Sequence, residues 1–160
     1  MKQGTTLFLK IAVLLIGIPI LALCIFLVPK FGNYAAELFP DITYMKSLVL
    51  IDMYTAAIPF YFALYQAFKL LSYIDKNQAF SELSVKALKN IKYCAITIST
   101  LYLLGMPLYY LMQTRIDPPI ITFIGLVIIF ASMVIAVFAA VLQWLLQEAI
   151  NIKSENDLTV

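Results

Sequence analysis

The sequence predicts an all-α protein, a bundle of four transmembrane helices. Four apolar runs, at about residues 11–28, 48–71, 91–112 and 120–149, are separated by short connections that hold most of the charged residues. A helix rises 1.5 Å per residue, so about 20 residues cross the roughly 30 Å hydrocarbon core of a bilayer. Hydrophobic residues make up 63% of the chain and charged residues 12%, against about 25% charged in soluble domains. We therefore expect one membrane domain, residues 1–152, followed by a short tail, residues 153–160.

The first apolar run follows two lysines and so resembles a signal sequence. A cleaved signal has a shorter apolar region that ends in a small-x-small site. Here the run continues to Val28 and ends at Pro29. A lipoprotein signal would carry a small residue before its cysteine, whereas Leu23 precedes Cys24. We expect a retained first helix.

The distribution of lysine and arginine predicts how the helices are oriented. Short connections rich in these residues stay in the cytoplasm. Three basic residues lie on one side of the predicted membrane and eight on the side of the two termini. We therefore expect both termini in the cytoplasm. The larger group lies on that side: Lys2, Lys10, Lys69, Lys76, Lys86, Lys89, Lys92 and Lys153. The smaller group lies outside: Lys30, Lys46 and Arg115.

The connections between the runs differ in their expected structure. For residues 29–45 a short surface helix and an irregular loop are equally compatible with the pattern. In the connection 72–90, Ser81 is suited to cap an amphipathic helix at about residues 81–90 that continues into the third span. Two interpretations of this basic helix remain open: an anchor on anionic lipid, or a docking surface for a protein. The residues that would contact such a partner are Phe80, Ser81, Lys86 and Lys89.

Small and polar residues recur on one face of three predicted spans. In membranes, helices pack through such residues. We therefore expect three faces to point into a compact bundle: Asp52, Ala56, Pro59, Ala63 and Gln66 in the second span, Ser99, Tyr102, Met106, Tyr109 and Gln113 in the third, and Gly125, Ser132, Ala136, Ala139, Gln143 and Gln147 in the fourth.

Asp52 is the one carboxylate well inside a predicted span. A charge there is costly unless it finds a partner or binds a proton. One interpretation is a proton- or cation-linked site, formed by Asp52, Tyr102, Tyr109, Gln66 and Gln143. The other is a structural hydrogen bond near the outer interface, or a salt bridge to Lys46 or Arg115. Pro19, Pro59 and Pro107 are expected to kink their helices and either open a lateral cavity for lipid or only shape the packing.

Several function classes find no support in the residues. The chain has no histidine, and we find no paired carboxylates at catalytic spacing, glycine-rich phosphate loop or metal-ligand pattern. We therefore expect a protein that is not an enzyme and that has no cofactor and no metal. A net charge of +2 does not indicate direct nucleic-acid binding. Cys24 and Cys94 both fall within apolar runs and are expected to be buried thiols.

Two segments resemble parts of a known family. The first is Asn77-Gln78-Ala79-Phe80-Ser81 together with the following Ser84–Ile91, and the second is the ending Glu155–Val160. The first is similar to the cytoplasmic loop, and the second to the chain ending, of a bacterial membrane-protein family catalogued as domain of unknown function 2975. The resemblance in spans and length covers nearly the whole chain. Many relatives are expected to carry a glycine or proline where this chain has Gln78-Ala79.

The resemblance implies a fold and a location, the bacterial cytoplasmic membrane, but no reaction. The genes of the family often accompany one for a small Cro-like helix-turn-helix regulator, which implies that the membrane protein binds this regulator. We expect an interaction or sensory protein that does so through residues 80–92 and the tail, including Asp157, Leu158 and Val160. The alternative is a protein that binds lipid or a small amphiphile, protects the envelope or transports through Asp52. A homodimer is compatible with either.

Overall fold

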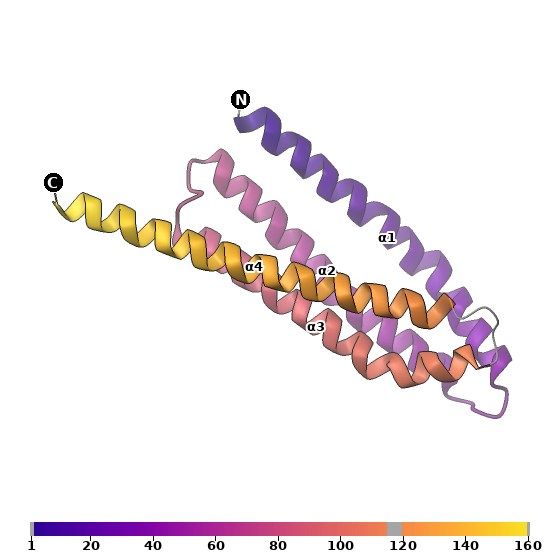
Figure 1. The fold of residues 1–160 in the computed structure, drawn as a ribbon. Coiled ribbons are helices and arrows are strands. Elements are labelled where there is room, and N and C mark those ends of the chain that lie inside the picture. The colour runs from indigo at the N-terminus through magenta and orange to yellow at the C-terminus, as the bar shows by residue number, and fades with distance from the viewer. Residues whose placement is uncertain (1, 115–119, 160) are drawn as a thin grey trace.

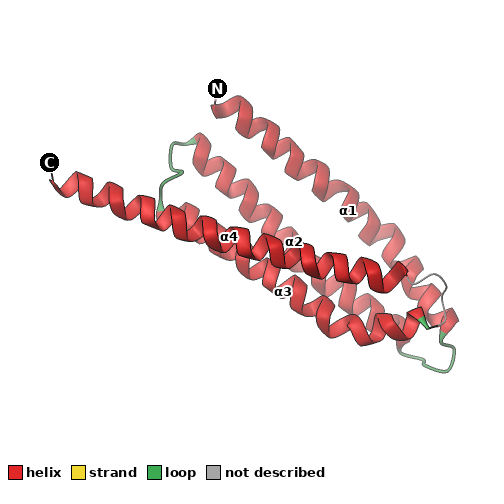
Figure 2. Cartoon of the chain, in the orientation of Figure 1, coloured by secondary structure: helices red, strands yellow, loops and turns green. Residues whose placement is uncertain are grey.

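The chain folds into four long helices in a computed structural model that describes residues 2–114 and 120–159 (Figures 1 and 2). They are α1 (Lys2–Leu38), α2 (Met45–Asp75), α3 (Glu82–Gln113) and α4 (Ile120–Thr159). These described ranges contain no strand. All four helices are long and apolar enough to cross a membrane. The predicted all-α bundle of four candidate transmembrane helices is confirmed.

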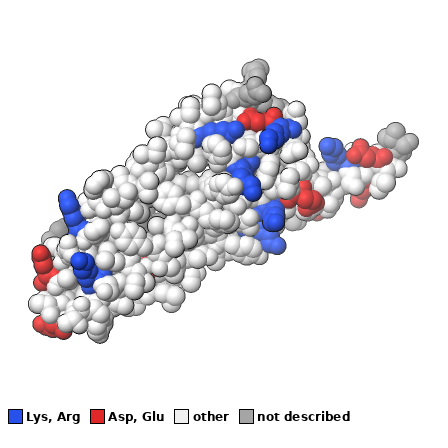
Figure 3. All heavy atoms as spheres, turned by 180° about the vertical axis from the view of Figure 1, so that it is seen from behind, with Lys and Arg blue, Asp and Glu red and all other residues white. Residues whose placement is uncertain are grey.

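The helices alternate in direction, so the start of α1, the end of α4 and the α2–α3 connection lie at one end of the bundle (Figure 1). We call this the terminal end; the α1–α2 connection, residues 39–44, lies at the opposite end. Figure 3 shows basic and acidic side chains gathered towards the two ends of one face, with a wide uncharged band between them. Such a band is the surface expected of a protein whose middle lies in lipid.

Extensive packing occurs between neighbours in the sequence: α1 with α2, α2 with α3, and α3 with α4. Within the described residues, α1 and α4 do not form a comparably large interface. The four helices are therefore arranged as an open row that curves, and α1 and α4 are its two edges.

Helix α1 is longer than the apolar run that predicts it, because it begins at Lys2 and passes through Pro29 to Leu38. The expected alternatives for this region, a separate surface helix or a loop, are both wrong for residues 29–38. The reason is packing against α2. Gly32 lies so close to α2 that an added Cβ would be 3.1 Å from Cδ2 of Leu50. Ala35 and Phe39 are buried in a small core at the opposite end, together with Met45, Val49, Tyr109 and Met112.

Tyrosine hydroxyl groups of α2 bind the backbone of α1. Tyr54 donates to the carbonyl oxygen of Cys24 at 2.9 Å, and Tyr61 donates to that of Gly17 at 2.8 Å. An added Cβ on Gly17 would lie 3.3 Å from Cδ1 of Leu64, so the two helices are close at this level. The tyrosine face of α2 therefore contacts α1, while its small and polar face is turned elsewhere.

The remaining interfaces follow the predicted pattern of small residues. Ala56 and Gln66 of α2, Ser99 and Tyr109 of α3, and Ser132, Ala136 and Ala139 of α4 are all buried. Helix α3 begins after Ser81, whose side chain accepts a hydrogen bond from the backbone nitrogen of Ser84, as the sequence predicts. Pro59 and Pro107 lie inside continuous helices.

The tail differs from expectation, since α4 continues as a helix to Thr159. The short tail expected from residue 153 is therefore not a separate segment over the described residues 153–159 but the end of this helix. This segment has no glycine or proline, and it extends a helix that already exists, so each further residue adds a hydrogen bond without a new nucleation step. Residues 151–158 are exposed on this projecting helix, which Figure 1 shows in yellow beyond the bundle.

Candidate functional site

Three of the predicted intramembrane polar residues lie together between α2 and α3. The hydroxyl group of Tyr109 donates a hydrogen bond to Oδ2 of Asp52. The ring of Tyr102 stacks on that of Tyr109, with centroids 6.3 Å apart and planes at 22°. A methyl group on Gly105 would lie 2.9 Å from Oδ2 of Asp52, so the absence of a side chain there makes room for the carboxylate.

In the described part of the chain, Asp52 has one of the partners considered for it. Its hydrogen-bond partner is Tyr109, and no ion pair with Lys46 occurs in the described part of the chain. Arg115 lies outside the described residues. Asp52 also lines a groove of about 330 Å³ between α2 and α3, with Thr55, Leu101 and Leu108. A neutral phenol bound to a carboxylate is an arrangement that can hold a proton, but it is equally a structural contact.

Gln66 and Gln143 lie away from this group. Gln66 is buried on α2, fourteen residues or about 21 Å along the helix from Asp52. Gln143 of α4 accepts a hydrogen bond from Nζ of Lys92 at 3.1 Å. The five polar residues singled out in the sequence therefore occupy separate levels of the bundle rather than one site.

A central cavity of about 510 Å³ lies among all four helices. Ile20 of α1, Phe60 of α2, Ile98 of α3 and Ile135 of α4 each form part of its wall. Cys24, Tyr102 and Ser132 are its polar wall residues. Since Tyr102 also stacks on Tyr109, one ring connects the cavity with the Asp52 group.

The cavity was not foreseen in this form, because the sequence left open whether proline kinks open a lateral cavity or only shape the packing. None of Pro19, Pro59 and Pro107 lines it, and Pro59 instead lines a groove between α2 and α3. The cavity exists because alanines face one another where larger side chains would fill the space. The sequence signal that could have revealed it is this set: Ala56, Ala57, Ala63, Ala67, Ala95 and Ala131.

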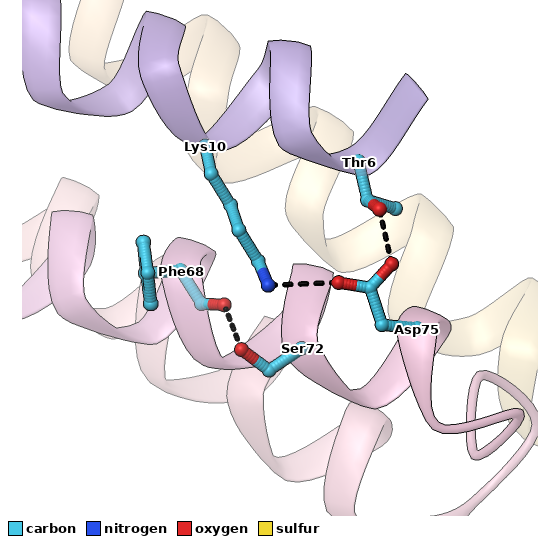
Figure 4. A network of polar contacts seen from close by, with 5 residues as sticks. All are labelled: Thr6, Lys10, Phe68, Ser72 and Asp75. Atoms are coloured by element: carbon cyan, nitrogen blue, oxygen red, sulfur yellow. Dashed lines mark hydrogen bonds and ion pairs between the residues drawn. The ribbon is translucent and has the colours of Figure 1, made fainter. Parts of the chain in front are cut away.

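A polar cluster joins α1 to α2 at the terminal end (Figure 4). Nζ of Lys10 lies 2.8 Å from Oδ2 of Asp75, and the hydroxyl of Thr6 donates to Oδ1. Nζ of Lys10 is also 5.3 Å from the centroid of the Phe68 ring. Sequence reasoning missed this cluster, although Lys10 and Asp75 fall at matching ends of antiparallel helices.

The residues proposed for partner docking also lie at the terminal end. Phe80 is 61% exposed beside the cap residue Ser81, and Lys86 and Lys89 are exposed one and two turns into α3. On the projecting part of α4, Asp157 is exposed and Leu158 is 83% exposed. Val160 lies outside the described residues.

A hydrogen bond relates the two docking segments to each other. Nε2 of Gln147 in α4 donates to Oε1 of Glu82, the first residue of α3, at 3.1 Å. Nε2 of Gln147 also donates to Oδ1 of Asn151 at 3.3 Å. The start of α3 therefore lies against α4 just before the projecting part of that helix. No group of three or more Cys, Asp or Glu residues placed to hold a metal occurs in the described ranges.

Comparison with known proteins places the chain among membrane proteins. A sequence model of the family described as "Protein of unknown function (DUF2975)" matches residues 30–160. Over 160 residues the chain is 75% identical to "Uncharacterized membrane protein YoaS" of Bacillus subtilis (strain 168), with 100% of each chain covered. No solved structure matches the chain. The family match includes both segments that carry the resemblance, and it leaves most of α1 outside.

Proposed function

The chain belongs to the family described as protein of unknown function (DUF2975), and we propose that it is a non-enzymatic interaction protein of the bacterial cytoplasmic membrane that binds a helix-turn-helix regulator. The observation that carries this proposal is the projecting end of α4. It presents Ile152, 55% exposed, and Leu158, 83% exposed, on a helix outside the bundle. Apolar side chains in the middle of the chain face lipid, whereas these two lie among Lys153, Glu155 and Asp157.

The start of α3 supplies the second half of the docking surface. Phe80 offers an exposed ring, and Lys86 and Lys89 offer positive charge beside it. The acidic residues Glu155 and Asp157 are on the α4 segment. Such a surface combines an apolar anchor with charges of both signs, a combination that gives orientation and specificity to a protein contact.

The side of the membrane follows from the lysines. Because connections rich in lysine stay inside, the terminal end faces the cytoplasm in this proposal. A regulator bound there is held at the membrane, and DNA binding then competes with membrane binding. Any signal that changes the affinity of this surface changes the free concentration of the regulator.

A cross-linking pull-down from native membranes tests the proposal. The baits are the full chain, a chain that ends at Ser154, and Leu158→Asp. A second pair of baits, Leu158→Ala and Leu104→Ala, supplies the matched control. Leu104 is 73% exposed in the apolar band, where an aspartate would place a charge in lipid, so alanine is used at both positions. The full chain and Leu104→Ala should recover a small DNA-binding protein, while the truncated chain and both Leu158 variants should not.

Other outcomes locate or refute the contact. Equal recovery by the full and truncated chains would assign docking to Phe80–Lys92, and Phe80→Ala with Lys86→Ala would then abolish it. If no bait recovers a DNA-binding protein under conditions in which the full chain is intact in the membrane, regulator binding is refuted.

A second function, binding of lipid or a small amphiphile, is favoured by the central cavity of about 510 Å³, a size that lies within the roughly 300–1,000 Å³ of small-molecule sites. In this alternative, which includes envelope protection or transport, Asp52 and Tyr109 act beside the cavity through Tyr102. Asp52→Asn separates the two functions. Loss of cellular function with normal folding and normal partner binding would support the second function, and an unchanged phenotype would count against a role for the carboxylate.

A further inference from the structure

The central cavity is open to the side of the bundle. Ile135 and Ala131 of α4 line it, yet Ile135 is 52% exposed and Ala131 is exposed as well. Ile20 and Cys24 lie on its α1 side. Because the described residues of α1 and α4 do not form an extensive interface, the space between these two helices offers an apolar chain a route from lipid to the cavity that avoids both ends of the bundle.

Ile91 is the α3 residue of the cavity wall nearest the terminal end. Lys92, the next residue of α3, is basic and lies beside the cavity wall rather than in it. Its Nζ donates to Oε1 of Gln143 at 3.1 Å and lies 4.9 Å from the centroid of the Tyr93 ring. Both partners are neutral. Lys92 is half-buried, and within the described ranges it has no carboxylate partner.

Comparison with Lys10 shows why this matters. Lys10 also lies near the inner limit of a span, but Asp75 neutralises it at 2.8 Å. Lys92 has no such partner in the described ranges, and it lies where the apolar run 91–112 begins, the level at which lipid head groups are expected on the terminal side. A half-buried cation in this position attracts an anion, and the nearest supply of anions is the membrane itself.

We propose that the central cavity holds one acyl chain of an anionic glycerophospholipid, which enters between α1 and α4 and places its phosphate at Lys92. The apolar wall receives the chain, and Nζ of Lys92 exchanges its contact with Gln143 for the phosphate or shares it. This inference rests on the second of the two functions proposed above and is independent of regulator binding.

Native mass spectrometry of the full chain tests the proposal. The chain is purified in detergent and titrated with phosphatidylglycerol or, separately, with zwitterionic phosphatidylcholine of the same acyl composition. One phosphatidylglycerol should bind per chain in preference to phosphatidylcholine. Lys92→Gln should lower the affinity for phosphatidylglycerol about fivefold, the effect of one lysine near an anionic head group, and should leave phosphatidylcholine unaffected. Lys76→Gln, which removes an exposed lysine at the same end, is the matched control and should change neither.

A cavity-filling variant tests the acyl site itself. Ala131→Phe places a ring in the opening and should reduce binding of both lipids, whereas Ala22→Phe, at an exposed position of α1 that does not line the cavity, should not. Equal binding by these two variants would overturn the acyl site, whereas the second proposed function would still be tested separately by Asp52→Asn. A different outcome would separate the two parts of the proposal. If Ala131→Phe loses binding while Lys92→Gln and Lys76→Gln prefer phosphatidylglycerol over phosphatidylcholine to the same degree, the role of Lys92 is overturned and the acyl site stands.

A measurement on the unaltered chain removes any dependence on the folding of variants. The chain is incubated with phosphatidylglycerol that carries a photoreactive group on its acyl chain. The complex is then irradiated, and the residues that carry adducts are identified. Adducts should concentrate on cavity residues such as Met53, Ala67 and Ile135. Adducts spread evenly over lipid-facing residues such as Leu103 and Phe130 would contradict a dedicated site.

Discussion

The two helical hairpins of this protein differ in where their polar contacts lie. Between α1 and α2, polar contacts recur from the start of α1 to Cys24: Lys10 and Thr6 with Asp75, Tyr61 with Gly17, and Tyr54 with Cys24. Between α3 and α4, the described polar contacts join Lys92 to Gln143 and Glu82 to Gln147 near the terminal end, and small residues are buried farther along, among them Ser99, Ala136 and Ala139. In the 18-residue window that identifies α1 as a candidate membrane span, only 6% of the residues are buried within the chain, against 22% in the corresponding window of α4.

The two hairpins should therefore respond differently to substitution. Close packing of small residues depends on shape, so a single added side chain disturbs it. Hydrogen bonds from hydroxyl groups to backbone carbonyls are separate and individually weak, because in lipid the separated helices also find partners. Helix α1 is therefore the more easily detached of the two edges of the bundle. The following changes test this contrast in order of expected effect.

Ala136→Leu should have the largest effect, because Ala136 is only 5% exposed and three further carbon atoms would have to displace its neighbours. Overpacking of this kind costs about 1–3 kcal/mol. The free energy of unfolding, measured by titrating detergent-solubilised protein with dodecyl sulfate, should fall by about that amount. Ala22→Leu at an exposed position of α1 is the control and should change it little. A similar loss in both variants would show that the small-residue interface is not special.

Tyr109→Phe should come next, since it leaves the carboxylate of Asp52 without its described hydrogen-bond partner. An unsatisfied buried polar group costs about 1–3 kcal/mol, and Asp52 is only half-buried, so we expect about 1 kcal/mol in the same unfolding titration. Asp52→Asn should cost less, because an amide oxygen can still accept from Tyr109. Equal losses in the two variants would mean that charge, rather than the unpaired acceptor, dominates at this position.

Tyr61→Phe should have a smaller effect of about 0.6 kcal/mol, the average of hydrogen bonds between membrane helices. It removes the bond to Gly17 while the ring stays in place. Tyr65→Phe is the matched control, since Tyr65 is 58% exposed on the same helix and has no described hydrogen bond. A loss above 2 kcal/mol for Tyr61→Phe would show that α1 depends on single contacts.

Asp75→Asn should have the smallest effect on global stability, because Lys10 and Asp75 are partly exposed and such pairs are screened by solvent. Its effect should be local. Hydrogen exchange of backbone amides in the first three turns of α1 should become faster, while exchange in α3 stays the same. Lys10→Gln should produce the same change, and the double variant no more than either one. Unchanged exchange in α1 would remove the cluster from the contacts that hold this helix.

Much of the fold could be predicted because it depends on local patterns. Four apolar runs predict four helices, Ser81 predicts the start of α3, and the spacing of Ser132, Ala136 and Ala139 predicts the buried face of α4. The prediction of the family is also confirmed. Each of these features is encoded within one helix or one turn.

The features that were missed depend on contacts between distant segments. Pro29 and the polar residues after it suggest an end to the first helix, yet contacts of Gly32 and Ala35 with α2 continue it to Leu38. The pairing of Lys10 with Asp75 and the alanine-walled cavity likewise appear only when antiparallel helices are aligned. Of the candidate site, Asp52 and Tyr109 were correctly grouped, whereas Gln66 and Gln143 could not be separated from them without that alignment.

The length of α4 sets a distance. Its 40 residues span about 60 Å, roughly twice the hydrocarbon thickness of a bilayer. Whatever depth the bundle adopts, a rigid portion of this helix must stand clear of the hydrocarbon. A flexible tail would allow Leu158 to occupy many positions within a volume set by the length of the tail. A helical tail holds Leu158 at one height and in one direction relative to the bundle. In the proposed complex with a regulator, α4 would therefore act as a spacer that sets the height above the membrane at which the partner is met, a property separate from the strength of binding.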